Sequence, residues 1–163
     1  MKSKQLRKKQ NKAAKKIVRV IENRRARFDY KLEGELVVGM ELEGPMVRAI
    51  RDGKIDLKGS FVTVSPKMEL WLNNASMTLK VNEPNKSQSA IFSDRIRLLA
   101  NKKEIFALTK AKNSGQTIVP LKVLQGGRYI KLVIAIGTGK KSFDKRETIK
   151  KRDLDRENKR GLE

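Results

Sequence analysis

The chain has 163 residues, of which 38% are hydrophobic and 35% are charged, and its formal net charge is +21. This length suits one domain of ordinary size with appendages. The chain contains neither cysteine nor histidine, which excludes disulfides, the usual zinc sites and the Ser-His and Cys-His nucleophile systems. Because so large a positive charge repels itself, nucleic acid is the first expected partner. An anionic membrane surface is the second, although the sequence has no apolar run of about 18 residues to span a bilayer.

The charge is concentrated at the two ends of the chain. Residues 1–27 hold twelve Lys and Arg against one Glu, and residues 138–163 hold ten against six acids. The first sixteen residues have no hydrophobic period and no apolar signal segment, so we expect them to be disordered alone and the protein to be cytoplasmic. We predict three parts, a basic N-terminal arm over 1–22, an RNA-binding β-barrel domain over 23–138 and a basic C-terminal tail over 139–163.

The segment NRRARFDY, residues 23–30, joins three arginines to two aromatic residues. Arg24, Arg25 and Arg27 are suited to RNA, because guanidinium groups bind phosphates and stack on bases. The alternative is a solvated basic arm that leads into a strand, with Phe28 or Tyr30 entering the core. Both interpretations stay open on the sequence alone.

The next elements are a strand and a short helix. Residues 36–42 alternate in the period of two that is typical of a strand. Residues 44–54 predict a short helix, because Pro45 suits a first helical turn and Gly53 suits a C-terminal stop.

Three further strands and a loop are expected in the middle of the chain. Two strands are predicted around the Ser65-Pro66 turn, and another over residues 76–81. Trp71 lies in the second of these strands, where it either stacks on a base or packs against an arm or helix. The polar segment over residues 82–90 is rich in breakers and predicts a loop.

A longer helix and a hairpin complete the domain. The helix is predicted over residues 98–115, because one side gathers Leu98, Leu99, Ile105, Phe106 and Leu108. Residues 117–137 alternate on both sides of Gln125-Gly126-Gly127, which predicts a hairpin. Together these elements favour a mainly β fold, a small antiparallel oligonucleotide-binding-type barrel with flanking helices.

The candidate catalytic motifs fail. Residues 137–142, GTGKKS, suggest a phosphate-binding loop, but Lys141 stands where Ser or Thr is required and Ile134 where the first Gly is required. Asp153 and Asp155 have Lys and Arg one helical turn away and are better explained as helix-stabilising partners. We therefore predict that the protein is not an enzyme and has no catalytic residues, no metal and no cofactor.

The tail begins with GKKSFDKRETIKKRD, residues 139–153. Asp144, with Glu147 three residues on, suits the start of a helix. The few apolar residues of the tail cannot dock it firmly on a core, and an isolated helix of this length is marginal in water. We expect the tail to be mostly unfolded when free and helical along an RNA surface. A solvated terminal helix is the alternative.

Five segments occur in a recognisable order from residue 23 to the C-terminus: NRRARFDY, VRAIRDGKIDLKGSF, RLLANKKEI, TIVPLKV and, most specifically, GKKSFDKRETIKKRD. In this order they resemble the SmpB family of SsrA-binding, or tmRNA-binding, proteins. The resemblance implies an oligonucleotide-binding-type barrel and a monomer with no membrane partner. It also implies a factor that binds the tRNA-like domain of tmRNA and delivers it to stalled ribosomes. The tail would enter the decoding centre and the empty mRNA channel, against ribosomal RNA of the small subunit.

The resemblance also implies which residues contact RNA. The positions matched to tmRNA binding are Arg24, Arg25, Arg48, Arg51, Lys54, Leu99 and Asn101. Those matched to the decoding centre and the tail are Gly139, Lys140, Lys141, Phe143, Asp144, Lys145, Arg146, Ile149, Lys150 and Arg152.

Three positions depart from the family pattern. Val37 and Met46 stand where the family usually has glutamates, and Phe143 replaces Tyr or His but keeps the capacity to stack. We therefore expect the RNA-facing surface of the barrel to have diverged more than the tail. A basic structural ribosomal or ribosome-assembly protein is the alternative function, and a nucleotide-dependent RNA enzyme is a third.

Overall fold

The structure is a computed structural model that describes residues 19–83 and 86–160. The segment expected to be disordered, residues 1–16, lies outside the described residues. Six antiparallel strands form a closed ring in which β4 pairs with β9 as well as with β5, and β1 extends the sheet beyond β9. In sheet order the strands are β1 (Val20–Glu22), β9 (Thr117–Leu124), β10 (Lys131–Gly139), β2 (Tyr30–Met40), β8 (Ile96–Leu99), β5 (Leu70–Asn73) and β4 (Phe61–Val64). The predicted small antiparallel barrel with flanking helices is confirmed.

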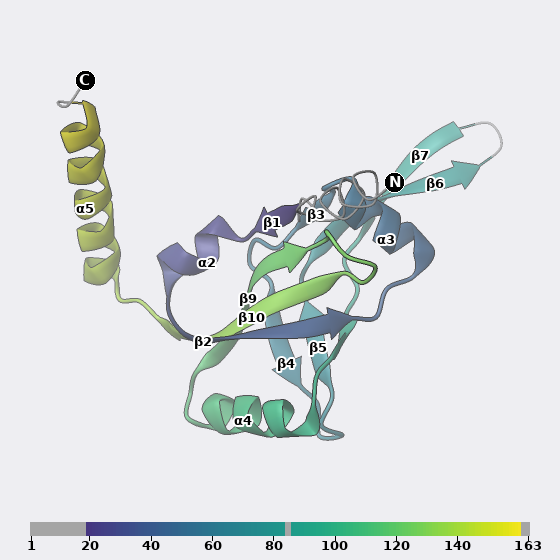
Figure 1. The fold of residues 1–163 in the computed structure, drawn as a ribbon, viewed down its shortest axis with the longest axis horizontal. Helices are drawn as coiled ribbons and strands as arrows, with labels where there is room; N and C mark the ends of the chain where they lie inside the picture. The colour runs from purple at the N-terminus through teal and green to yellow at the C-terminus, as the bar shows by residue number, and fades with distance from the viewer. Residues whose placement is uncertain (1–18, 84–85, 161–163) are drawn as a thin grey trace, which may run out of the picture.

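Two helices lie at the ends of the barrel and complete its core (Figure 1). Helix α3 (Gly44–Arg51) has Pro45 in its first turn, as predicted, and buries Ile50 completely. Helix α4 (Lys102–Asn113) buries Ile105 and Leu108 against the same core cluster. Both helices therefore add buried side chains to the core that the strands enclose.

The strand β2 is longer than predicted and contains a bulge. Glu33 pairs with Ile136 and Glu35 pairs with Ala135, so Gly34 has no partner between them. Gly34 has a φ of +60°, which glycine adopts without the steric cost of a Cβ atom. Bulges of this kind bend a strand and increase its twist, which suits a strand that runs around a small barrel. The strand therefore begins at Tyr30, six residues before the predicted start at residue 36.

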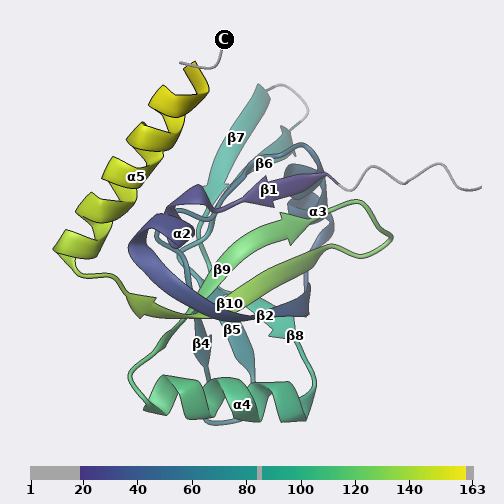
Figure 2. The same cartoon turned by 60° about the vertical axis from the view of Figure 1, so that its left-hand side comes forward.

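A second sheet projects from the barrel (Figures 1 and 2). Its strands are β3 (Ile55–Asp56), β6 (Ser76–Glu83) and β7 (Lys86–Phe92), and β6 and β7 pair from Met77 with Phe92 to Glu83 with Lys86. The prediction of a loop over residues 82–90 was therefore wrong. Hairpin arms that extend away from the core need no apolar side chains, so their composition resembles that of a loop.

Two other predictions need correction. Leu98 and Leu99 belong to β8, and α4 starts only at Lys102, where the Glu104 carboxylate accepts a hydrogen bond from the Asn101 N–H. Leu98 faces the core and Leu99 faces outward, which is the alternation of a strand. The segment before β2 is a short helix, α2 (Arg24–Asp29), rather than an arm that leads straight into the strand.

The predicted strands around Ser65-Pro66, the strand at residues 76–81 and the hairpin over residues 117–137 are all confirmed. The tail forms helix α5 (Ser142–Arg160), which extends away from the barrel beside α2 (Figure 2). The sequence predicted a tail that is mostly unfolded when free and helical along RNA; the structure has the helix, and the unfolded free state stays a prediction. Contacts at its base, described below, supply anchoring that an isolated helix lacks.

Candidate nucleic-acid interface

Asn23 holds α2 against the barrel. Its side-chain amide donates to the carbonyls of Leu57 and Pro120, both at 3.0 Å, and its Oδ1 accepts from the N–H of Ala26 at 3.2 Å. Because Asn23 is buried, its side-chain amide relies on these protein groups for its hydrogen bonds. Asn23 is thus a helix cap and a tertiary clamp at once. Sequence reasoning treated it as part of an RNA-binding segment and missed this structural role.

The clamp presents the cations of α2 to solvent. Arg24, Arg25 and Arg27 are outside the core, and Arg27 lies 3.5 Å from the Glu35 carboxylate. Phe28 and Tyr30 are partly buried, and Tyr30 packs against the small cluster of Ala26 with residues of β9 and β10. The segment therefore combines the two alternatives, RNA contact and an aromatic residue that enters the core. Its aromatic residues are partly buried, and its arginines stay accessible.

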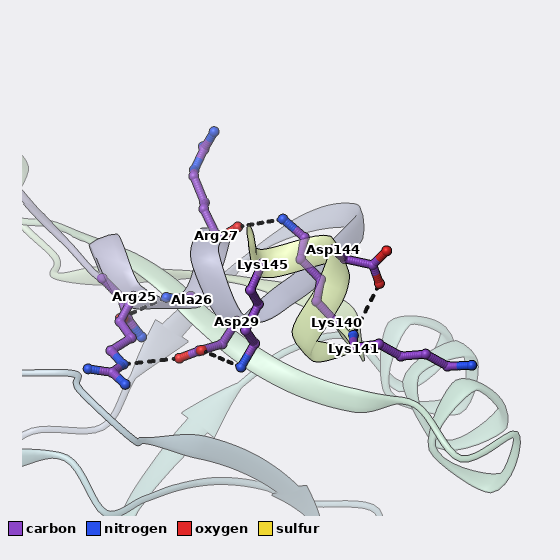
Figure 3. Close-up of polar contacts among 9 residues, drawn as sticks. Arg25, Ala26, Arg27, Asp29, Lys140, Lys141, Asp144 and Lys145 are labelled. Carbon is purple, nitrogen blue, oxygen red and sulfur yellow. Dashed lines mark hydrogen bonds and ion pairs between the residues drawn. The ribbon is translucent and has the colours of Figure 1, made fainter. Parts of the chain in front are cut away.

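Asp29 connects α2 to the base of the tail (Figure 3). Its carboxylate accepts hydrogen bonds from the Lys145 ammonium at 2.9 Å and from the Arg25 guanidinium at 3.1 Å. The hydrogen bond from Lys145 lowers the pKa of Asp29 below its ordinary value of 3.8; partial desolvation opposes this shift, and Arg25 adds to it. The Asp29 side chain is 24% exposed, so it lies at the surface junction of α2 and α5.

Lys140 forms a second connection between the same elements. Its backbone N–H donates to the Asp29 carbonyl at 2.9 Å, and its ammonium donates to the Arg27 carbonyl at 3.2 Å. The Asp144 carboxylate accepts from the Lys141 N–H at 3.1 Å within the first turn of α5, which begins at Ser142, two residues before the predicted start at Asp144. The structure thus brings the α2 residues and the tail signature together.

A hollow of about 650 Å³ lies where the barrel meets the tail helix. It is lined by Lys31, Thr138, Gly139, Lys140, Lys141, Phe143, Asp144 and Glu147. Phe143 is 57% exposed, and the lining of the hollow combines it with three lysines and two acidic residues. An exposed ring among cations is suited to stacking a base while neighbouring phosphates are neutralised. Arg146, Ile149 and Lys150 are exposed further along α5, and the side chain of Arg152 lies outside the described part of the structure.

The residues matched to tmRNA binding form three exposed groups rather than one cluster. Arg24 and Arg25 lie on α2, and Leu99 and Asn101 lie between β8 and α4. Arg48, Arg51 and Lys54 lie on α3 and just after it, at another side of the barrel (Figure 1).

Two of the positions that depart from the family pattern, Val37 and Met46, differ in their exposure to solvent. Val37 is 50% exposed on the outer face of β2, two residues before Gly39, which pairs with the 52% exposed Leu99. It therefore adds to an apolar patch beside Leu99. Met46 is buried in the core cluster, so its change from the family residue is a matter of packing.

The remaining candidates are accounted for by local contacts. The half-buried Trp71 ring lies 5.8 Å from the guanidinium of Arg95, so a cation lies over its face. Among the described residues, no group of three or more His, Cys, Asp or Glu is placed to hold a metal ion. None of the helices in the described part of the chain is long and apolar enough to cross a membrane.

Comparison with known proteins identifies one family. Residues 20–163 match the family model of the SmpB protein. The SsrA-binding protein of Oenococcus oeni is 42% identical over 83% of this chain and 86% of its own length. The SsrA-binding protein of Enterococcus hirae is 38% identical over 85% of this chain and 88% of its own length. A solved structure described as "tmRNA-SmpB: a journey to the center of the bacterial ribosome" is similar with a TM-score of 0.57 and 34% identity, over 76% of this chain and 85% of that one.

Proposed function

The chain belongs to the SmpB family, and on this premise we propose that it is a trans-translation factor, which binds tmRNA and delivers it to ribosomes stalled on messages that lack a stop codon. Its relatives are SsrA-binding proteins, and the similar solved structure is of tmRNA and SmpB on the ribosome. The protein acts as an RNA-binding factor in the cytoplasm, where ribosomes are.

One observation carries this proposal: a strongly basic helix extends from a compact barrel and is joined to it at a defined base (Figure 2). A globular domain gains no core from such a helix, since its exposed apolar residues, Ile149 and Leu154, point to solvent. A helix of this kind suits insertion between ribosomal RNA surfaces, where charge rather than apolar area stabilises binding.

The barrel and the tail divide the work. The barrel binds the tRNA-like domain of tmRNA through Arg24, Arg25, Arg48, Arg51, Lys54, Leu99 and Asn101, all placed outside the core. The exposed arginines and lysine neutralise phosphates, and Leu99 with Val37 supplies an apolar contact. The tail, from Gly139 through the DKR sequence at residues 144–146, enters the decoding centre of the small subunit and the empty mRNA channel.

A triple variant tests this division. Asp144→Ala, Lys145→Ala and Arg146→Ala together should leave the affinity for the tRNA-like domain unchanged and abolish peptide tagging on stalled ribosomes in a reconstituted translation system. Lys110→Ala with Lys112→Ala is the matched control, because it removes exposed positive charge from the end of α4, away from both proposed surfaces. Tagging that survives the triple variant would contradict the role of the tail, and lost tmRNA affinity would contradict the division of labour.

A further inference from the structure

We infer that Asp29 is a positioning residue, which sets the direction in which the tail helix leaves the barrel. The proposed function requires the tail, but it does not identify the residues that set the orientation of the tail helix relative to the barrel. The inference stands on the contacts between α2 and α5, and it depends on the proposed function only for its consequence on the ribosome.

Two connections to one short helix define the direction of α5. Lys140 contacts the carbonyls of Arg27 and Asp29 just before the helix begins, and Lys145 contacts the Asp29 carboxylate in its first turn. A helix held at one point would pivot, whereas a second contact within the first turn restricts its angle. The Lys145 ammonium also lies 6.0 Å from the centre of the Phe28 ring, which adds a weak attraction on the same side.

Asp29 is itself held in place from the barrel. Arg25 contacts it from one turn earlier in α2, at 3.1 Å. Asn23 fixes α2 through the carbonyls of Leu57 and Pro120, which belong to the loop before β4 and to β9. A continuous series of contacts therefore runs from the barrel through α2 to the tail. Rotation of the tail away from this direction breaks the Asp29–Lys145 ion pair.

The chemistry of Asp29 also favours an internal role. A carboxylate repels phosphate, so it is an unfavourable residue among the cations of an RNA-binding surface. Here its charge is paired with the Arg25 guanidinium at 3.1 Å and the Lys145 ammonium at 2.9 Å. Its contribution to RNA binding is then indirect, through the position of the tail.

The direction of the tail can be measured on the protein alone. The chain has no cysteine, so Ala107→Cys in α4 and Asn158→Cys in α5, both at exposed positions, give a unique pair of spin-label sites. The distance distribution between the labels should have one dominant narrow component. A partly exposed ion pair changes the equilibrium between two orientations of the tail helix by up to about fivefold. Asp29→Asn should therefore raise the fraction of label distances outside the dominant component by about that factor. Asp29→Glu, which keeps the charge, should restore most of the dominant component.

Glu33→Gln is the matched control, because Glu33 is an exposed carboxylate whose nearest cation is Lys31 at 3.8 Å, within the same strand. It should leave the distribution unchanged, and helical circular dichroism should be equal in all variants. A broad distribution in the unsubstituted chain, or an unchanged one in Asp29→Asn, would overturn the inference.

On the ribosome, Asp29→Asn should slow peptide tagging several-fold while the affinity for the tRNA-like domain stays the same. Loss of that affinity would instead make Asp29 part of the tmRNA surface and would also overturn the inference. The two proposals can fail separately, because the distance measurement contains no RNA and the triple tail variant tests tagging directly.

Discussion

At the scale of single residues, Asn23 shows how a residue in a recognisable RNA-binding segment can have a structural role. Its side chain makes three hydrogen bonds, to Leu57, Pro120 and Ala26, from a buried position. Any replacement that lacks the amide loses these three hydrogen bonds, although the Leu57 carbonyl still accepts from Ser60 and the Ala26 N–H still donates to the Asn23 carbonyl. The side chain therefore adds to the attachment of α2, together with the bond from the Asn23 N–H to the Leu121 carbonyl and the packing of Ala26.

We predict that Asn23→Ala lowers the free energy of unfolding by about 2–4 kcal/mol, from the loss of a helix cap and of two buried hydrogen bonds to backbone carbonyls. Urea denaturation followed by circular dichroism measures the change. Asn113→Ala, at the exposed end of α4, should change stability by less than about 0.5 kcal/mol. A small effect of Asn23→Ala would show that the three hydrogen bonds are not required.

Asp29 gives a prediction for pH. Because its pKa in the folded chain is lower than in the unfolded chain, its contacts stabilise the fold fully above the ordinary Asp value. This contribution is lost as the pH falls below 3.8 and through the lower folded pKa. The charged groups that face it are Arg25 of α2 and Lys145 of α5. Thermal unfolding over a pH series should show the difference between the unsubstituted chain and Asp29→Asn shrinking in acid, and a difference that grows there would contradict the assignment.

At the scale of elements, the barrel depends on the helices that fill its ends. Ile50 of α3 and Ile105 of α4 belong to the same core cluster as the inward residues of the strands. Each helix contributes apolar side chains that no strand supplies, because a small ring of strands leaves both openings unfilled. The tail helix differs, since the described apolar residues of its later turns are exposed.

This contrast predicts unequal effects of the same kind of truncation. Ile50→Ala should lower the free energy of unfolding by about 2–5 kcal/mol, because it leaves a cavity in a fully buried site. Leu154→Ala in α5, where the side chain is 58% exposed, should change it by less than about 0.5 kcal/mol. Equal losses of stability in the two variants, measured by urea denaturation, would mean that α5 packs on the domain more firmly than the structure indicates.

At the scale of the whole molecule, the proposed tmRNA surface contains two kinds of contact. Arg48 and Arg51 are exposed cations near one end of the barrel, whereas Leu99 is an exposed apolar residue on β8. Phosphate contacts release counterions and make affinity depend on salt, and apolar contacts do not. The dependence of binding on salt therefore separates the two kinds of residue.

We predict that Arg48→Gln or Arg51→Gln lowers the slope of log K against log salt for the tRNA-like domain by about 1. Leu99→Ala should weaken binding at every salt concentration and leave the slope unchanged. Filter binding over a range of KCl concentrations measures both quantities. Lys110→Gln, on the exposed side of α4, should alter neither, and an equal change of slope there would show that only the total charge matters.

Hydrophobic periodicity and turn residues correctly predicted several helices and strands. The short helix after Pro45, the strands around Ser65-Pro66 and the hairpin over residues 117–137 follow from periodicity and turn residues. Helix α2 was missed, although Asn23 before a run of helix-compatible residues was an available N-cap signal. The outer end of β6 and most of β7, within residues 82–90, were missed because pairing away from the core requires no apolar alternation.

Sequence by itself determined the chemical class of this protein. Its charge, its lack of cysteine and histidine and its segments in family order indicated an RNA-binding barrel with a basic tail, because composition and local patterns need no knowledge of the fold. Only the tertiary structure showed that Asn23 is a buried clamp and that Asp29 meets Lys145, 116 residues along the chain. Such contacts depend on how the barrel closes and on which ends of its strands become neighbours, and no local pattern contains that information.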